Sequence, residues 1–296
     1  MASLRMKIVS AYLRIAVKPT MSTAAKAREA MEEPKTTSVV PRVLRRTHAV
    51  NTARIGGFTS YRLQPRTGAP THAVLYLHGG AYSGEIAPQH WDLVSAMVSA
   101  GLRVDVPIYG LTPQFTYRDA YEFIVTLYTR LRAEADSVAV MGDSSGGALA
   151  LGLVQHILDH GGRPPERLVL ISPWLDLTLT NPDIADMESR DPWLTRAGLI
   201  EAGRAWAGGD DPTVSALSPI NGTLAGLPAT EVYIGTHDIF HPDTLELRDR
   251  AARAGSDVQV IECAGAVHVY PLVPAPEGRK ARAAIVASVT PDNARD

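Results

Sequence analysis

Short apolar runs alternate with longer stretches of helical periodicity from residue 72 onward, and this alternation constrains the fold more than any other feature. Because strand–helix–strand units pack most simply as right-handed crossovers, it predicts an α/β fold with a mostly parallel sheet and helices on both faces. The expected strands are residues 74–77, 104–108, 138–141, 168–171, 232–234 and 258–261. The expected helices are residues 91–100, 117–132, 148–158 and 244–254.

Two regions lack this alternation. Residues 1–45 indicate helices and a loop at 34–41, and residues 181–226 are rich in Trp, Pro, Asp and Gly. Ligands of parallel sheets bind at the carboxyl ends of the strands. We therefore expect residues 1–45 to form N-terminal cap helices, and residues 46–296 to form the sheet domain, with a second cap segment inserted at about 181–226.

The N-terminal stretch also raises the question of a membrane segment. Its apolar residues recur at helical spacing and are Leu4, Ile8, Ala11, Tyr12 and Ile15. This pattern predicts an amphipathic helix packed on the body of the protein, with membrane contact as a secondary alternative. The apolar stretch at 8–17 is interrupted by a basic residue and is too short to span a bilayer, so we predict a cytoplasmic protein without stable membrane insertion.

The charge and the cysteine content exclude some partners and some kinds of stabilising site. The 296 residues carry twenty-nine basic and thirty-one acidic side chains, a formal charge of −2, which argues against a nucleic-acid partner. Cys263 is the single cysteine and allows neither an internal disulfide nor a zinc cluster. We predict no metal and no cofactor.

A last strand near 258–261 at the sheet edge could pair with a second copy of the chain, so a homodimer is a further prediction.

The pentapeptide Gly-Asp-Ser-Ser-Gly at residues 142–146 lies between an expected strand and an expected helix. In this context it has the form G-x-S-x-G, in which a strained serine is held at the sheet edge. A phosphate-binding loop would occupy the same position, but neither phosphate-loop motif occurs here. We therefore predict Ser144 as a nucleophile.

A second glycine-rich turn follows the expected strand at 74–77 and begins at His78. A serine that attacks a carbonyl creates an oxyanion, which prearranged backbone N–H groups must meet. The expected donors are the amides of Gly79, Gly80 and Ala81, together with that of Ser145. The sequence leaves open which amides of the loop take part.

The serine also needs a base and an acid. Of nine histidines, His268 is favoured because it lies in a loop after the expected strand at 258–261. Asp238 directly follows the expected strand at 232–234 and is favoured as its acid, with Asp243 as the alternative. The chain order Ser144, Asp238, His268 is typical of α/β-hydrolases.

The segment 237–243 permits a second interpretation, because imidazoles and carboxylates alternate there. Two histidines four residues apart would share a face of a helix and could bind a metal. Pro242 indicates that a helix only begins at this point, however, and we favour surface histidines.

Taken together, these residues resemble the hormone-sensitive lipase branch of the α/β-hydrolase esterases. The shared motifs are HGGAY at 78–82, GDSSGG at 142–147, SPWLDL at 172–177, LSP at 217–219, GLP at 226–228, GTHD at 235–238 and VHVY at 267–270. The resemblance implies Ser144 as nucleophile, His268 as general base and Asp238 as orienting acid, with the oxyanion hole in the Gly79–Gly80 loop. Ala81 replaces a third glycine and Gln114 replaces a glutamate that many members have.

The resemblance implies a serine carboxylesterase that hydrolyses small esters of short to medium acyl chains. An amidase or formamidase with the same triad is the alternative, and a non-catalytic binder of the same fold is a third reading, which the presence of His268 disfavours. Tyr82, Trp174 and Trp193 are candidates for substrate binding, with core packing as the alternative for each tryptophan.

Overall fold

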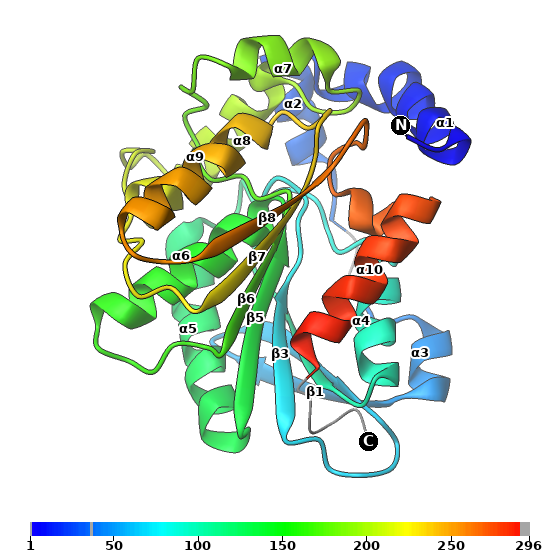
Figure 1. Cartoon of the computed structure of the whole chain (residues 1–296), viewed down its shortest axis with the longest axis vertical. Coiled ribbons are helices and arrows are strands. Elements are labelled where there is room, and N and C mark those ends of the chain that lie inside the picture. The colour runs from blue at the N-terminus through cyan, green and yellow to red at the C-terminus, as the bar shows by residue number, and fades with distance from the viewer. Residues whose placement is uncertain (1, 36–37, 291–296) are drawn as a thin grey trace.

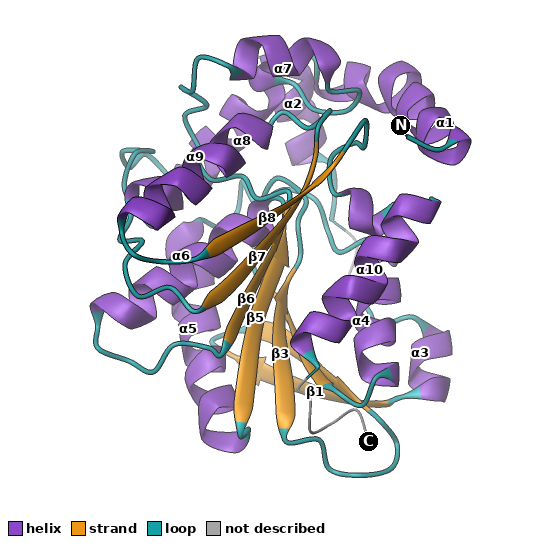
Figure 2. Ribbon diagram, viewed as in Figure 1, coloured by secondary structure: helices purple, strands orange, loops and turns teal. Residues whose placement is uncertain are grey.

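The computed structural model describes residues 2–35 and 38–290, so the first residue, two residues of the 34–41 loop and the last six residues of the predicted sheet domain lie outside the description. Its centre is an eight-stranded sheet in the order β1-β2-β4-β3-β5-β6-β7-β8, shown in Figures 1 and 2. The strands are β1 Ala49–Ile55, β2 Phe58–Gln64, β3 His72–Leu77, β4 Arg103–Ile108, β5 Ser137–Asp143, β6 Arg167–Ile171, β7 Ala229–Gly235 and β8 Val258–Cys263. All neighbours from β4 to β8 are parallel, which confirms the predicted α/β class.

Ten α-helices surround the sheet in the described part of the chain. They are α1 Leu4–Tyr12, α2 Ala24–Glu32, α3 Arg42–Thr47, α4 Pro88–Ser99, α5 Tyr117–Glu134, α6 Ser145–Asp159, α7 Ile184–Arg190, α8 Arg196–Ala207, α9 His241–Arg253 and α10 Pro276–Val289. The expected strands fall within β3 to β8, and the expected helices overlap α4, α5, α6 and α9.

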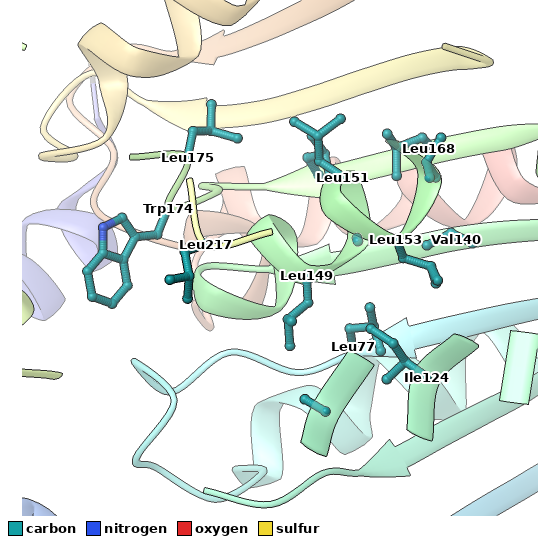
Figure 3. Close-up of a cluster of buried hydrophobic side chains, with 14 of the residues drawn as sticks. Leu77, Ile124, Val140, Leu149, Leu151, Leu153, Leu168, Trp174, Leu175 and Leu217 are labelled. Carbon is teal, nitrogen blue, oxygen red and sulfur yellow. The ribbon is translucent and has the colours of Figure 1, made fainter. Parts of the chain in front are cut away.

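The core lies in two layers, one on each face of the sheet. Along β3 the side chains alternate, so that Leu75 and Leu77 join one buried cluster while Val74 and Tyr76 join the other. The first cluster includes residues of α5 and α6, and Figure 3 shows Leu77 facing Ile124 within it. The second includes residues of α4 and α10. Burial on both faces explains why β3 reads as a continuous apolar run.

The sequence prediction missed the hairpin of β1 and β2. Its turn is formed by Gly56 and Gly57, both with positive φ, which is a recognisable hairpin signal. The strand itself is hard to detect, because β1 is an edge strand with four consecutive exposed residues and shows no alternation of apolar and polar positions. β2 runs antiparallel to both of its neighbours. The prediction also missed α10.

The N-terminal helix packs on the body of the protein as predicted, but through a different side. Leu4, Ile8, Tyr12 and Ile15 are 60% to 78% exposed instead of packed on the body. The opposite side of the same segment packs inward, with Met6 and Leu13 buried in the second cluster. Apolar residues therefore occupy two sides of this helix, and periodicity alone does not tell which side is covered.

The two segments without strands lie together beyond the carboxyl ends of the parallel strands (Figure 1). Lys18 donates through Nζ to the backbone carbonyl oxygens of Glu188 and Asp191, each at 2.6 Å, and the Thr195 hydroxyl donates to the Met21 carbonyl at 2.5 Å. The N-terminal segment is thus attached to α7 and α8. None of the described helices is both long and apolar enough to cross a membrane.

Candidate active site

Ser144 occupies the sharp turn between β5 and α6. Its φ of 52° and ψ of −121° lie in a region that residues with a side chain rarely adopt. Glycine is required on both sides: a Cβ on Gly142 would stand 2.1 Å from the Gly146 carbonyl oxygen, and one on Gly146 would stand 2.1 Å from the Leu77 carbonyl oxygen. The predicted close approach of strand and helix is therefore present.

The serine side chain meets the predicted base. Ser144 Oγ lies 3.0 Å from His268 Nε2, and His268 Nδ1 lies 2.9 Å from Asp238 Oδ2. A carboxylate only accepts hydrogen bonds, so the Nδ1 of a neutral His268 carries the proton and Nε2 accepts from the Ser144 hydroxyl. The structure brings together all three residues predicted from the sequence.

Burial and charge act on His268 in opposite directions. Burial alone lowers the pKa of His268, but the Asp238 carboxylate and its hydrogen bond, with help from Asp191 and Asp143, raise that pKa above its usual value of 6.5. The imidazolium form is therefore stabilised at this position. Ser144 is 7% exposed and His268 is 2% exposed, so the pair is nearly closed off from solvent.

Two backbone features hold the histidine loop against the sheet. A Cβ on Gly235, the last residue of β7, would stand 2.3 Å from the Ala266 carbonyl oxygen, so only glycine permits this contact. Val269, directly after His268, has a φ of 48°, and its N–H donates to the Ser172 hydroxyl at 2.9 Å. The imidazole is positioned by its loop as well as by its acid.

Asp243, the alternative acid, has a different environment. It lies in the first turn of α9, as expected, but it is 1% exposed and its Oδ2 has no hydrogen-bond partner among the described residues. Burial, followed by the charge of Asp176, raises the pKa of Asp243 to about 7. The carboxylate bonded to His268 belongs to Asp238, so the geometry favours Asp238 as the orienting acid.

The glycine-rich turn adopts an unusual backbone. Gly80, Ala81 and Tyr82 all have positive φ, at 128°, 51° and 59°. The Gly79 N–H donates to Asp143 Oδ1 at 3.0 Å and is thereby engaged within the protein. The turn also touches the start of α6, because the Tyr82 N–H donates to the Ser145 hydroxyl at 3.3 Å.

Asp143, the residue before the serine, was not assigned a role from the sequence. Its buried carboxylate also accepts from the Tyr76 hydroxyl at 2.6 Å and contacts His90 Nε2 at 3.2 Å. His90 Nδ1 accepts from the Ala87 N–H, so His90 Nε2 carries the proton and donates. Burial raises the pKa of Asp143, but these partners hold it below its usual value. The sequence signal that could have revealed Asp143 is a single acidic residue at the end of an otherwise apolar strand, because a buried charge needs partners.

Asp191 is a second residue that the sequence reasoning missed. Its Oδ1 accepts from the Trp193 and Leu194 N–H groups at 2.6 and 2.9 Å, and its Oδ2 accepts from the Ile239 N–H at 2.8 Å. Ile239 follows Asp238, so this carboxylate joins the loop between α7 and α8 to the loop of the orienting acid. Burial, followed by the charge of Asp238, raises the pKa of Asp191 to about 6. The bonds to Trp193 and Leu194 are a local turn, but the bond to Ile239 spans 48 residues, and no local pattern indicates it.

The three aromatic candidates lie in two environments. Trp174 and Tyr82 belong to the first core cluster at 0% and 1% exposure, and Tyr82 stacks on Trp206 with ring centroids 4.4 Å apart. Trp193 is half-buried and meets His268 edge to face at 5.5 Å, and Phe240 meets the same imidazole at 5.3 Å. A role in substrate binding stays a prediction for all three candidates.

The model of a protein family described as the alpha/beta hydrolase fold matches residues 74–272. The chain belongs to this family. An acetyl-hydrolase from Streptomyces hygroscopicus is 32% identical over 216 residues, which cover 70% of this chain and 72% of that protein. These findings confirm the predicted family, and they confirm the prediction that the protein is a carboxylic ester hydrolase.

Two solved structures share the fold of this α/β hydrolase. A Staphylococcus aureus protein assigned provisionally as an esterase superimposes with a TM-score of 0.81 at 32% identity, covering 90% of this chain and 91% of that one. An esterase from the bacterial hormone-sensitive lipase family superimposes with a TM-score of 0.77 at 24% identity, covering 93% of this chain and 98% of that one. Within residues 2–35 and 38–290, no group of three or more His, Cys, Asp or Glu residues is placed to hold a metal ion.

Proposed function

We propose that this α/β hydrolase is a serine carboxylesterase that cleaves esters of short to medium acyl chains through an acyl-enzyme. The observation that carries the proposal is the continuous hydrogen-bonded chain from Ser144 through His268 to Asp238 at the carboxyl edge of the sheet. Nucleophile, base and orienting group are in hydrogen-bond reach of one another, as nucleophilic catalysis requires.

In the first half of the reaction, Ser144 Oγ attacks the ester carbonyl carbon while its proton passes to His268 Nε2. Asp238 stabilises the imidazolium that forms and keeps Nδ1 protonated. Collapse of the tetrahedral intermediate breaks the bond to the alcohol oxygen, which takes the proton from His268. In the second half, His268 activates water, which attacks the acyl-enzyme and releases the carboxylic acid.

The oxyanion of both intermediates is held by backbone amides. Because Asp143 already accepts from the Gly79 N–H, we assign the donors to Gly80, Ala81 and Ser145. Ser145 begins α6, and the first N–H groups of a helix have no carbonyl partner one turn earlier. The helix dipole adds to the stabilisation of the anion. Asp143 positions the turn through Gly79.

The preference for small esters rests on the enclosure of the site. The serine and the imidazole are nearly covered, with Trp193 and Phe240 against the imidazole edge. The segments 1–45 and 181–226 act as a cap over this edge of the sheet, and a long acyl chain would have to displace more of it. Substrate entry then requires displacement of cap side chains.

An active-site titration tests the proposal. An organophosphate should modify Ser144 alone, as mapped by peptide mass spectrometry, and hydrolysis of p-nitrophenyl esters should fall from short to long acyl chains. Equal labelling of the Ser144→Ala variant would overturn the assignment of the nucleophile. A p-nitroanilide turned over faster than its matched ester would replace the esterase with an amidase. Labelling without turnover of either would indicate a non-catalytic binder. The cytoplasmic location and the homodimer stay predictions.

A further inference from the structure

We propose that the N-terminal helical segment, residues 2–18, docks this protein on the surface of an anionic lipid bilayer. The side chains that carry the proposal are Leu4, Ile8, Tyr12 and Ile15, which we call the apolar stripe. Their exposed fractions are 74%, 60%, 63% and 78%. The proposal does not depend on the catalytic assignment.

The stripe is a continuous surface feature and not a set of scattered side chains. Spacings of four residues place Leu4, Ile8 and Tyr12 on one side of α1, and Ala11 between them is exposed as well. Ile15 follows in the π-helical turn Leu13–Val17 that continues α1. The opposite side packs into the protein through Met6 and Leu13. Half of the exposed large hydrophobic residues in the described part of the chain lie in this one segment. A contiguous apolar patch of this kind marks a contact surface.

The charges around the stripe select the partner. Residues 1–28 contain six of the twenty-nine basic side chains and none of the thirty-one acidic ones, although the whole chain has a net charge of −2. Arg5 and Lys7 are exposed, and helical geometry places them along the two borders of the stripe. Arg14 is exposed as well, with its guanidinium bonded to the Ser189 and Arg190 carbonyl oxygens. An apolar face bordered by cations is the arrangement that binds at the interface of an anionic bilayer.

A second copy of the chain fits this surface less well. A twofold contact between two stripes would bring the same basic residues of both copies together, and like charges across an interface oppose association. The anionic headgroups of a bilayer pair with the same side chains. The helix would lie in the membrane plane, since the described helices are too short or too polar to cross it.

A cleft beside the stripe extends the apolar surface inward. It has a volume of about 630 Å³ and is lined by Ala11 and Ile15 on the helix and by Ala264 and Gly265 on the loop after β8. Lys7 and Arg14 belong to the same lining. The cleft thus combines an apolar floor with two cations, which suits an acyl chain attached to an anionic headgroup. Figure 1 shows α1 at the periphery of the molecule, where a planar surface can reach it.

Vesicle co-sedimentation of the full chain tests the proposal. Phosphatidylcholine vesicles with phosphatidylglycerol should bind the protein, and pure phosphatidylcholine vesicles should bind it weakly. Binding should weaken when the salt is raised from about 0.1 M to about 1 M, because the Debye length falls from ~10 to ~3 Å. Arg5→Gln with Lys7→Gln should weaken it about tenfold or more. Equal binding to both vesicle types, or no binding to either, would overturn the proposal.

Matched double variants separate the stripe from general surface hydrophobicity. Ile8→Ser with Ile15→Ser should lower vesicle binding by at least about tenfold. Val39→Ser with Val43→Ser, at side chains 56% and 62% exposed outside the segment, should leave it unchanged. Equal loss in both pairs would remove the stripe as the cause. Thermal unfolding of each variant checks that the fold is intact.

Two further measurements test whether the stripe contacts lipid directly and whether it binds a second copy of the chain instead. Tyr12→Trp retains an aromatic side chain on the stripe, and its added fluorescence should be quenched by brominated lipid in anionic vesicles. Absence of added quenching would contradict contact at the stripe. Analytical ultracentrifugation without lipid should give a species that is unaffected by Ile8→Ser with Ile15→Ser. A dimer that this variant dissociates would assign the stripe to a second copy and overturn the proposal.

Discussion

The loops at the carboxyl edge of the sheet and the helices above them are fixed by different kinds of contact. At the edge, backbone meets backbone at distances that only glycine allows, as where Gly146 passes the Leu77 carbonyl. Above it, long side chains reach to carbonyl oxygens, as Lys18 does to Glu188, and a close glycine contact, Gly198 against the Met21 carbonyl, adds to them. Tight backbone contacts leave little room for adjustment, whereas contacts at the ends of flexible side chains can be exchanged. We call the loops at the carboxyl edge of the sheet the rigid centre, and the helices of segments 1–45 and 181–226 the cover. Asp191 lies at the junction, because it bonds to amides of both regions.

The largest expected effect lies in the rigid centre. Ser144→Ala removes the nucleophile and should reduce kcat for a p-nitrophenyl ester by something on the order of 10⁶. Because the change removes a single oxygen atom, thermal unfolding should change little. Turnover close to that of the wild type would contradict the assignment of the nucleophile. The rigid centre would then not be the place of the reaction.

The two buried aspartates near α9 form a matched pair. Asp238→Asn should reduce kcat by about 10⁴, because the amide favours the wrong tautomer of His268. Asp243→Asn, at a side chain without contact to the imidazole, should leave kcat nearly unchanged. Steady-state kinetics of both variants make the test, and exchanged effects would mean that Asp243 is the orienting acid.

The same Asp243 variant has a signature in stability. With a pKa of about 7 in the folded protein and a usual value of 3.8, Asp243 holds its proton in the native state when the unfolded chain has lost it. Wild-type stability therefore falls as pH rises through this window. Asp243→Asn should raise the unfolding temperature relative to wild type more at pH 8 than at pH 4. An equal shift at both pH values would contradict a buried acid of raised pKa.

The pH profile tests the electrostatics of the rigid centre. His268 must be neutral to accept the serine proton, so kcat/KM should rise with pH through an apparent pKa above 6.5. Below that value the rate should fall about tenfold for each unit of pH. Initial rates across the acid range give the midpoint. A flat profile between about pH 5 and 8 would show that no histidine acts as base.

The junction should give a smaller effect. Asp191→Asn loses charge-assisted hydrogen bonds, and a loss of about 1.5 kcal/mol would reduce kcat/KM about tenfold. Because the Asp191 carboxylate also raises the pKa of His268, the midpoint of the pH profile should move downward. A lower rate with an unmoved midpoint would restrict Asp191 to a packing role.

The smallest effect is expected in the cover. Lys18→Met breaks the two bonds to the Glu188 and Asp191 carbonyl oxygens and should raise KM a few-fold with kcat nearly unchanged. Lys26→Met is the matched control, because the Lys26 Nζ donates to the Pro19 carbonyl oxygen within the same segment. If Lys18→Met lowered kcat as strongly as Asp191→Asn, the cover would be part of the rigid centre.

Local patterns in the chain were sufficient to predict most of the sheet and the three residues that the structure brings together, Ser144, His268 and Asp238. Runs such as 74–77 are buried on both faces and are apolar throughout, and the proposed nucleophile, acid and base each follow a strand at the same sheet edge. The hairpin of β1 and β2 escaped detection because its edge position leaves β1 exposed. Asp143 escaped because its partners, among them the Gly79 N–H, come from other parts of the chain. Asp191 escaped because its link to the loop of Asp238 runs through the distant Ile239 N–H.

The sequence by itself determined that a serine, an acid and a histidine each follow a strand of one parallel sheet. Such a sheet brings the carboxyl ends of its strands together. Only the tertiary structure decided which amide of the glycine-rich turn is engaged by Asp143, and which side of the N-terminal helix faces solvent. The physical reason is the same in both cases. Spacing along a chain fixes which residues share a face or an edge, whereas the partner of each group depends on what else packs there.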